Sequence, residues 1–136
     1  MVLYQQAAAI PYRILDQKLQ VLLISSRNGK KWIIPKGIIE KGDSPETTAL
    51  KETREEAGVE GQLTNGLIGK FSYQKWGGIC KVRVFPLLVS KVLDQWDEDF
   101  RERKWVDVSK ALTIVKPKKA ASIINKFEKV LKKQGL

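Results

Sequence analysis

Three glutamates in one short stretch have the spacing of a metal site. Glu52, Glu55 and Glu56 are three and four residues apart, and a helix of about 3.6 residues per turn would present them on one sector of its surface. Like charges at these separations each destabilise a helix by roughly 0.2 to 0.5 kcal/mol. A divalent cation would offset this repulsion. Mg²⁺ is the expected ion because it takes carboxylate, water and phosphate oxygens, with Mn²⁺ as a substitute.

The alternative interpretation of the same spacing is a solvated acidic helix face that binds nothing. The surrounding residues therefore have to show that a helix forms and that one side of it is buried. Ser44 is a good N-cap, Pro45 suits the first helical position, and Gly58 can end the helix in the left-handed conformation. These residues predict a helix over 45–57. Its core-facing stripe is expected to contain Ala49, Leu50, Thr53 and Ala57.

The stretch GIIEKGDSPETTALKETREEAGV resembles the signature of the Nudix hydrolases over its whole length. Six positions match at the required separations: Gly37, Glu52, Glu55, Glu56, Gly58 and Val59. Three positions depart from the pattern. Asp43 replaces a glutamate, Lys51 replaces an arginine, and Thr53 replaces an apolar residue. The lysine matters most, because an ammonium cannot make the two-pronged carboxylate contact of a guanidinium.

The resemblance implies an α/β fold, the α/β/α sandwich of the family with a mixed sheet between helices. It also implies hydrolysis of phosphoanhydride bonds, with Mg²⁺ held by Glu52, Glu55 and Glu56. The candidate catalytic carboxylates are Glu52, Glu55 and Glu98. By family analogy Glu52 is the first choice for the general base, and Glu98 with its neighbours Asp97 and Asp99 is the reserve. A solvated loop is an equally good interpretation of these three downstream acids.

The remaining elements are predicted from apolar periodicity and turn residues. A hairpin is expected over 6–14 and 19–25 with a turn at 16–18, followed by a short strand at 32–34 that ends at Pro35. After the acidic helix we expect strands at 67–74 and 79–92 around Gly77 and Gly78, a short strand at 103–106, and a closing helix over 120–131.

Length and composition indicate one domain spanning residues 1–136. The chain has no histidine, which excludes Ser-His-Asp and Cys-His catalysis, histidine-ligated zinc and phosphohistidine chemistry. No apolar run is long enough to span a membrane, and the N-terminus lacks a secretory signal pattern. Cys80 is the only cysteine, so no disulfide can form within the chain and a cytoplasmic location is the default expectation.

The net charge of +10 indicates a polyanionic partner. Residues 101–136 contain 11 Lys and Arg against 3 acids, although a solvated helix face is the ordinary explanation for any single lysine there. Two classes of partner compete, a highly phosphorylated small molecule and nucleic acid. Lys36, directly before the motif glycine Gly37, is placed where its charge could reach a metal-bound phosphate.

A looser resemblance covers most of the chain and favours the small molecule. The runs LLISSRNGKKWIIPKG, VLDQWDEDFRERKW and KPKKA resemble the diphosphoinositol polyphosphate phosphohydrolases and the related hydrolases of dinucleoside polyphosphates. The expected substrate-binding residues are Arg27, Lys36, Gly37, Lys81, Arg103 and Lys116.

Other functions remain open from the sequence. The same chemistry could act on nucleoside triphosphates, ADP-ribose or capped RNA, although the absence of a proline near Gln74 argues against the ADP-ribose hydrolases of the family. A catalytically silent fold that binds RNA through its basic C-terminal surface is the alternative from another class. The sequence does not decide the oligomeric state.

Overall fold

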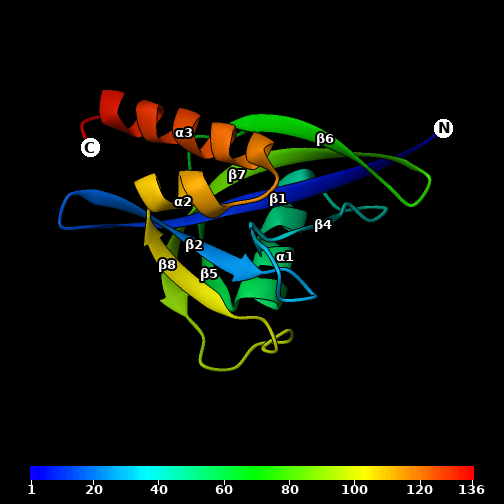
Figure 1. The fold of residues 1–136 in the computed structure, drawn as a ribbon, viewed down its shortest axis with the longest axis horizontal. Coiled ribbons are helices and arrows are strands. Elements are labelled where there is room, and N and C mark those ends of the chain that lie inside the picture. Colours follow the sequence, from blue (N-terminus) through cyan, green and yellow to red (C-terminus); the bar gives the residue numbers. More distant parts are fainter.

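A mixed eight-stranded sheet forms the centre of the structure, which is a computed structural model describing all 136 residues (Figure 1). The elements follow in chain order: β1 (Val2–Leu15), β2 (Lys18–Ser25), β3 (Trp32–Ile33), β4 (Lys36–Ile38), α1 (Pro45–Ala57), β5 (Val59–Leu63), β6 (Gly69–Lys75), β7 (Gly78–Val92), β8 (Arg103–Asp107), α2 (Val108–Ile114) and α3 (Lys118–Lys133).

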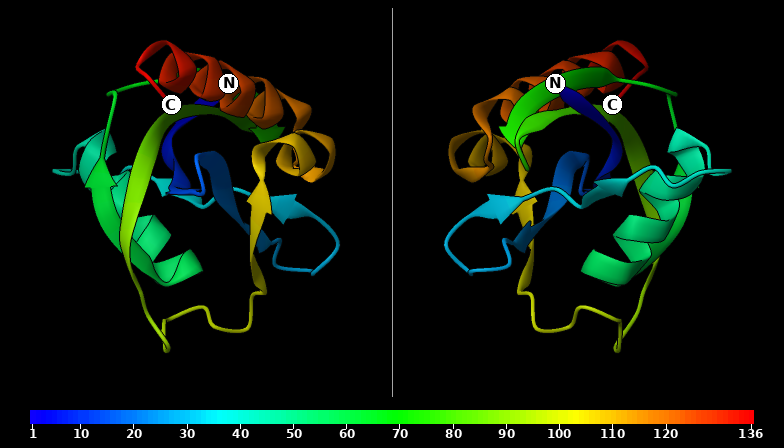
Figure 2. Two further views of the ribbon diagram at one scale, coloured as in Figure 1. Left: turned by 90° about the vertical axis from the view of Figure 1, so that its left-hand side faces the viewer. Right: turned by 90° about the vertical axis from the view of Figure 1, so that its right-hand side faces the viewer.

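The two longest strands, β1 and β7, run parallel from the Val2–Gly78 pair to the Tyr12–Leu88 pair. Every other strand pair is antiparallel. Strand β1 pairs with β4 on its other edge near Ala7 and then with β2 beyond Tyr12, and β7 carries both β6 and β5. Besides pairing with each other, β1 and β7 therefore each pair with two further strands in succession. The sheet curves strongly (Figure 2).

Helices cover both faces of this sheet, as the predicted sandwich requires (Figures 1 and 2). The strand alternation of β7 separates the two cores, because Val82 and Val84 face α3 whereas Phe85 and Leu87 face α1. On the α3 side the core includes Ile123, Ile124, Phe127 and Leu131 of the predicted helical stripe. No helix combines the length and the apolar character needed to cross a membrane.

Helix α1 has the predicted boundaries because its end signals are local. The Ser44 hydroxyl accepts the Thr47 amide, Pro45 begins the helix, and Gly58 ends it with φ of 65°. Ala49 packs on Ala7 and Ala9 of β1, and such small side chains let the helix lie close to the sheet. The prediction that Leu50 belongs to the core stripe was wrong: this residue is 39% exposed, and Thr48 is buried instead.

Three elements were not predicted, namely β4, β5 and α2. The loop expected after Pro35 is strand β4, because its backbone pairs with β1. Both predicted hairpins form, with two-residue turns whose residues have positive φ, Asp16 and Gln17 in the first and Trp76 and Gly77 in the second. Helix α3 is longer than expected by two residues at each end.

Candidate active site

Glu56 is the most buried acid of the predicted metal cluster. Its residue is 8% exposed, and its carboxylate accepts a hydrogen bond of 3.2 Å from the backbone amide of Lys36. Burial is the main reason that the pKa of Glu56 is raised to about 8, and the nearby charge of Arg101 opposes the shift. The chain thus keeps a carboxyl group in a place where its ionised form is unfavourable.

Glu52 lies beside Glu56, one helical turn earlier. Burial, followed by the negative charge of Glu55, raises the pKa of Glu52 to about 7. Its side chain packs on Gly37 so closely that a Cβ atom there would overlap the Glu52 carboxylate. The motif glycine is therefore required by the position of Glu52, and helix α1 and strand β4 together build this part of the site.

Two departures from the expected motif compensate each other. The ammonium of Lys51 lies 3.4 Å from Asp43 Oδ2, and both side chains are about one-third exposed. Desolvation lowers the pKa of Lys51. The hydrogen bond to Asp43 and the surrounding carboxylates together outweigh this effect, so the pKa is raised overall. Lys51 thus binds the acid at the start of the motif rather than one of the three helical glutamates.

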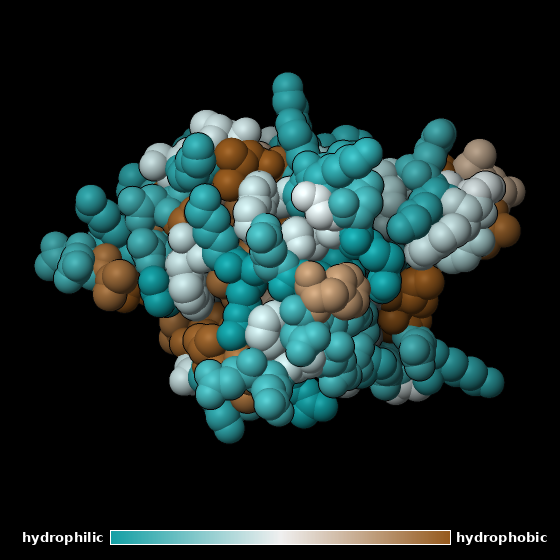
Figure 3. Space-filling view, turned by 60° about the horizontal axis from the view of Figure 1, so that its bottom comes forward, coloured by the Kyte–Doolittle hydropathy of each residue, from teal (hydrophilic) through white to brown (hydrophobic).

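The loop over residues 93–102 brings Glu98 to the end of α1. The Glu98 amide donates to the Glu55 carbonyl at 2.9 Å, and Trp96 Nε1 donates to the Glu56 carbonyl at 3.1 Å. Asp97 and Asp99, the other reserve acids, are exposed. This loop lies at the lower end of the molecule in Figure 1. The surface seen from that side is largely hydrophilic (Figure 3).

Arg101 is a site residue that the sequence did not reveal. Its side chain is 7% exposed and lies 2.9 Å from Glu98 Oε1, while its Nη1 donates to the Ser25 carbonyl at 2.9 Å. The predicted Arg27 reaches the same Glu98 oxygen at 3.5 Å, with 74% of its side chain exposed. Glu98 therefore lies between a buried and an exposed arginine, next to the three helical acids.

Lys36 lies between the acid cluster and Tyr73, on the α3 side of the sheet. Burial lowers its pKa, partly opposed by the charge of Glu56, and its Nζ lies 5.2 Å from the centre of the Tyr73 ring. The Tyr73 hydroxyl donates to Gln6 at 2.7 Å. Tyr73 also lines a hollow of about 560 Å³ between β6 and the beginning of α3, where Lys118 and Lys119 are found. No sequence pattern singled out Tyr73, because its place beside Lys36 follows from the pairing of β6 with β7.

The other predicted phosphate contacts occupy different places. Lys116 is exposed directly before Pro117 of the same hollow. Arg103 donates to the carbonyls of Ala57, Gly58 and Leu93 at 2.7 to 3.1 Å and stacks on Trp96, so it holds the end of α1. Lys81 alternates with Cys80 and Val82 on β7 and projects from the α1 side of the sheet, away from Tyr73.

The donor set of the acid cluster suits a hard divalent cation. All its side-chain donors are carboxylate oxygens, which Mg²⁺ and Mn²⁺ accept, and two of the carboxyl groups have raised pKa values that a nearby cation would lower. In this structure the acids are adjacent but not gathered around one point. The three acids therefore suit the ion by the chemistry of their oxygen donors and by their spacing of three and four residues on α1.

Comparison with known proteins agrees with this description. The NUDIX domain matches residues 3–129. The chain is 43% identical over 117 residues to Nudix hydrolase 21, chloroplastic, of Arabidopsis thaliana, covering 81% of this chain and 59% of that relative. It is 32% identical over 114 residues to diphosphoinositol polyphosphate phosphohydrolase 3-alpha of Mus musculus, covering 82% of this chain and 68% of the mouse protein.

The fold is also found among solved structures. The crystal structure of the C. elegans Ap4A hydrolase superimposes with a TM-score of 0.75 at 22% identity, covering 96% of this chain and 99% of that one. This likeness concerns the fold. The chain spans about three-fifths of the length of the plant relative named above.

Proposed function

The chain belongs to the Nudix hydrolase family, and from that premise we propose that it is a Mg²⁺-dependent pyrophosphohydrolase of a highly phosphorylated small molecule. The substrate we propose is a dinucleoside polyphosphate or a diphosphoinositol polyphosphate. The names of the mouse relative and of the C. elegans structure support this choice of class, as does the net charge of +10.

The observation that carries the proposal is the buried carboxyl group of Glu56 beside Glu52. Two carboxyl groups with pKa values raised to about 7 and 8 destabilise the ion-free protein near neutral pH. A solvated acidic face, the alternative interpretation of the spacing, would leave these groups in water with nothing to gain from burial. A cation among them turns the same arrangement into a binding site.

The residues of the site have separate proposed roles in hydrolysis. A cation bound by the acids would neutralise the pyrophosphate and make an attacking water more acidic. Glu52 is the general base we propose, on the family resemblance and because it lies beside Glu56, one helical turn away in the acid cluster that would bind the cation. Glu98 is the alternative base, and its ion pair with Arg101 holds its carboxylate next to α1.

Positive side chains on the α3 side of the site complete the proposed substrate path. Lys36 is next to the acids, and Lys116, Lys118 and Lys119 stand around the hollow that Tyr73 lines. Such groups stabilise charge on phosphate as the anhydride bond breaks. Arg103 and Lys81 do not belong to this path. The Arg103 guanidinium already donates to backbone carbonyl groups, and Lys81 projects from the other face of the sheet.

A substrate panel tests the proposal directly. Hydrolysis is measured with Mg²⁺, Mn²⁺ or EDTA for dinucleoside polyphosphates, inositol pyrophosphates, nucleoside triphosphates, ADP-ribose and capped RNA, and the values of kcat/KM are ranked. We expect one of the first two classes to lead, EDTA to abolish turnover, and Glu56→Gln to lower kcat by about 10² or more. The same substitution at the exposed Glu102 is the control.

The panel also separates the alternatives. A preference for ADP-ribose, nucleoside triphosphates or capped RNA would keep the metal chemistry and reject the substrate class. Full activity of Glu56→Gln would reject the metal assignment. Absence of phosphate release from every compound, with strongly salt-dependent binding to arbitrary RNA, would favour the silent RNA-binding fold.

A further inference from the structure

A second cluster of cations lies on the opposite face of the sheet from Lys36 and Tyr73. Lys70 of β6 and Lys81 and Arg83 of β7 project from the α1 side, where they surround a groove of about 300 Å³. The groove has four further lining residues: Gln5, Phe71, Ser72 and Val82. We name it the outer-face groove. None of its seven residues is an acid.

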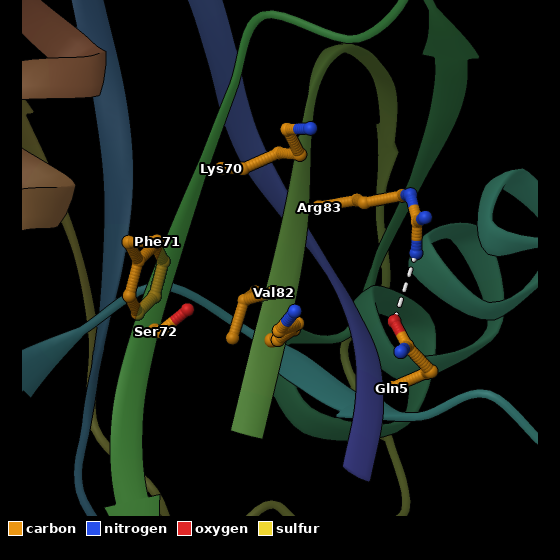
Figure 4. A pocket seen from close by; sticks show the side chains of 7 residues that line it. Gln5, Lys70, Phe71, Ser72, Val82 and Arg83 are labelled. Atoms are coloured by element: carbon orange, nitrogen blue, oxygen red, sulfur yellow. Dashed lines mark hydrogen bonds between the residues drawn. The ribbon is translucent and has the colours of Figure 1, made fainter. Parts of the chain in front are cut away.

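Strand register places the three cations next to one another. Lys70 is directly opposite Arg83, and Lys81 is opposite Ser72 on one side and Gln5 on the other. Directly opposed residues of a sheet have Cβ atoms about 5 Å apart, so the charged groups of the three side chains can reach one small anion. Arg83 reaches across β1 and donates to Gln5 at 3.0 Å, with Lys70 on the neighbouring strand (Figure 4).

No acid of the chain pairs with the positive charges in the groove. None of the five ion pairs of the structure includes Lys70, Lys81 or Arg83, and both lysines are exposed. Like charges directly opposite each other destabilise a sheet. A solvated surface selected for stability alone would alternate the signs of its charges. This groove holds three positive charges together, with the Ser72 hydroxyl and the Gln5 amide beside them.

We infer that the outer-face groove is a second anion-binding site, which takes a compact ligand with clustered phosphates and does not require the metal. The volume suits a short phosphate chain. Single-stranded RNA is the poorer fit, because such binding uses exposed aromatic faces for stacking, and the only aromatic residue of the groove, Phe71, is 6% exposed. The site goes beyond the proposed hydrolase activity and does not depend on it.

The test uses sodium tripolyphosphate as the probe, in EDTA, with the full chain. Isothermal titration calorimetry compares the wild type with a Lys70→Gln/Arg83→Gln double variant. The matched control is Lys126→Gln/Lys129→Gln, which removes two exposed lysines of α3 and changes the net charge equally. We expect the groove variant to bind at least about tenfold more weakly, because two charge-assisted contacts are lost, and the control to bind like the wild type.

Two further measurements keep the outcome unambiguous. The melting temperature of the ligand-free groove variant should be at least that of the wild type, since a like-charge pair has been removed. Amide shifts in an NMR titration should concentrate on residues 70–72 and 81–83. Equal weakening in both double variants, shifts that concentrate around Lys36 and Lys116, or preferential binding of an unstructured RNA would each overturn the proposal. The binding experiments are done in EDTA, whereas the proposed hydrolysis needs Mg²⁺. Failure of the anion-site proposal can therefore be told apart from failure of the hydrolase proposal.

Discussion

The backbone amide of Lys36 donates to the carboxylate of Glu56 at 3.2 Å, which joins the first residue of β4 to the last turn of α1. This bond and the charge of Arg101 favour the ionised carboxylate, whereas burial opposes it more strongly. The balance leaves the pKa of Glu56 at about 8. The metal-free protein therefore holds a proton at Glu56 over a pH range in which the unfolded chain has released it.

The first prediction is a loss of stability of the metal-free protein as pH rises. Below the ordinary pKa of about 4.5 both states are protonated and Glu56 has no effect. Stability should fall from there to about pH 8, where the folded state also loses its proton, and then level off. Glu52, with a pKa raised to about 7, adds to the fall. The measurement is the free energy of urea unfolding from pH 4.5 to 9 in EDTA.

Glu56→Gln isolates the contribution of Glu56, because the amide oxygen can still accept the Lys36 bond. Since one pKa unit corresponds to about 1.4 kcal/mol, we expect this variant to gain on the order of 2 to 4 kcal/mol over the wild type at pH 9 relative to pH 4.5. Glu102→Gln, at an exposed site, is the control. Parallel pH curves for wild type and Glu56→Gln would show that the carboxyl group is not held protonated.

The second prediction concerns the contact of Gly37 with Glu52. Gly37→Ala introduces a methyl group into the space of the Glu52 carboxylate, and the flexible glutamate side chain should move while the fold stays intact. Because small displacements of catalytic groups have large effects, kcat should fall by about 10- to 100-fold with little change in the melting temperature. Ile38→Ala, at the next and more exposed residue, is the control, and an unchanged kcat in Gly37→Ala would count against Glu52 as a functional ligand or base.

Local signals explain which parts of the fold were predictable. Helix α1 was predicted to the residue because Ser44, Pro45 and Gly58 specify its ends within a few positions. Strand β4 has no such signal, since its three residues are held by pairing with β1. Strand β5, with Gly61 at a register shift, likewise exists through β7. These elements depend on partners far away in the sequence, and a pattern of neighbours cannot show them.

The site divides in the same way. The spacing of the three helical acids identified one cluster, and the alternation of β7 could show that Lys81 and Val82 face opposite ways. The sequence could not show which face of the sheet contains Lys36 and Tyr73. Arg101 was missed because its contact with the Ser25 carbonyl joins residues 76 positions apart. Arg103 was expected at phosphate, and only the folded chain shows its contacts with the end of α1.

The third prediction separates Arg103 from Arg27. Arg103→Lys keeps a charge but loses the forked donor that holds three carbonyl groups, so the free energy of unfolding should fall by about 2 to 4 kcal/mol. Arg27→Gln changes a side chain that is 74% exposed and should alter stability by less than about 0.5 kcal/mol while raising KM for a polyphosphate substrate. Equal stability of both variants, with a higher KM only in Arg103→Lys, would restore Arg103 to the substrate site.

The last prediction uses two buried threonines of α1. Thr53, at the motif position where an apolar residue is expected, is fully buried and its hydroxyl has no hydrogen-bond partner. An unsatisfied buried polar group costs about 1 to 3 kcal/mol, so Thr53→Val should stabilise the protein by about 1 kcal/mol and raise the melting temperature by about 3 °C. Hydrolase activity should be unchanged, because Thr53 faces the core and not the acids.

Thr48 is the matched control for this substitution. It is equally buried, but its hydroxyl donates to the Ser44 carbonyl at 3.0 Å, so Thr48→Val removes a formed hydrogen bond. We expect this variant to lose about 1 kcal/mol. Differential scanning calorimetry of the two variants should therefore give melting temperatures on opposite sides of the wild type. A loss of stability in Thr53→Val equal to that in Thr48→Val would mean that the Thr53 hydroxyl has a partner in the folded protein.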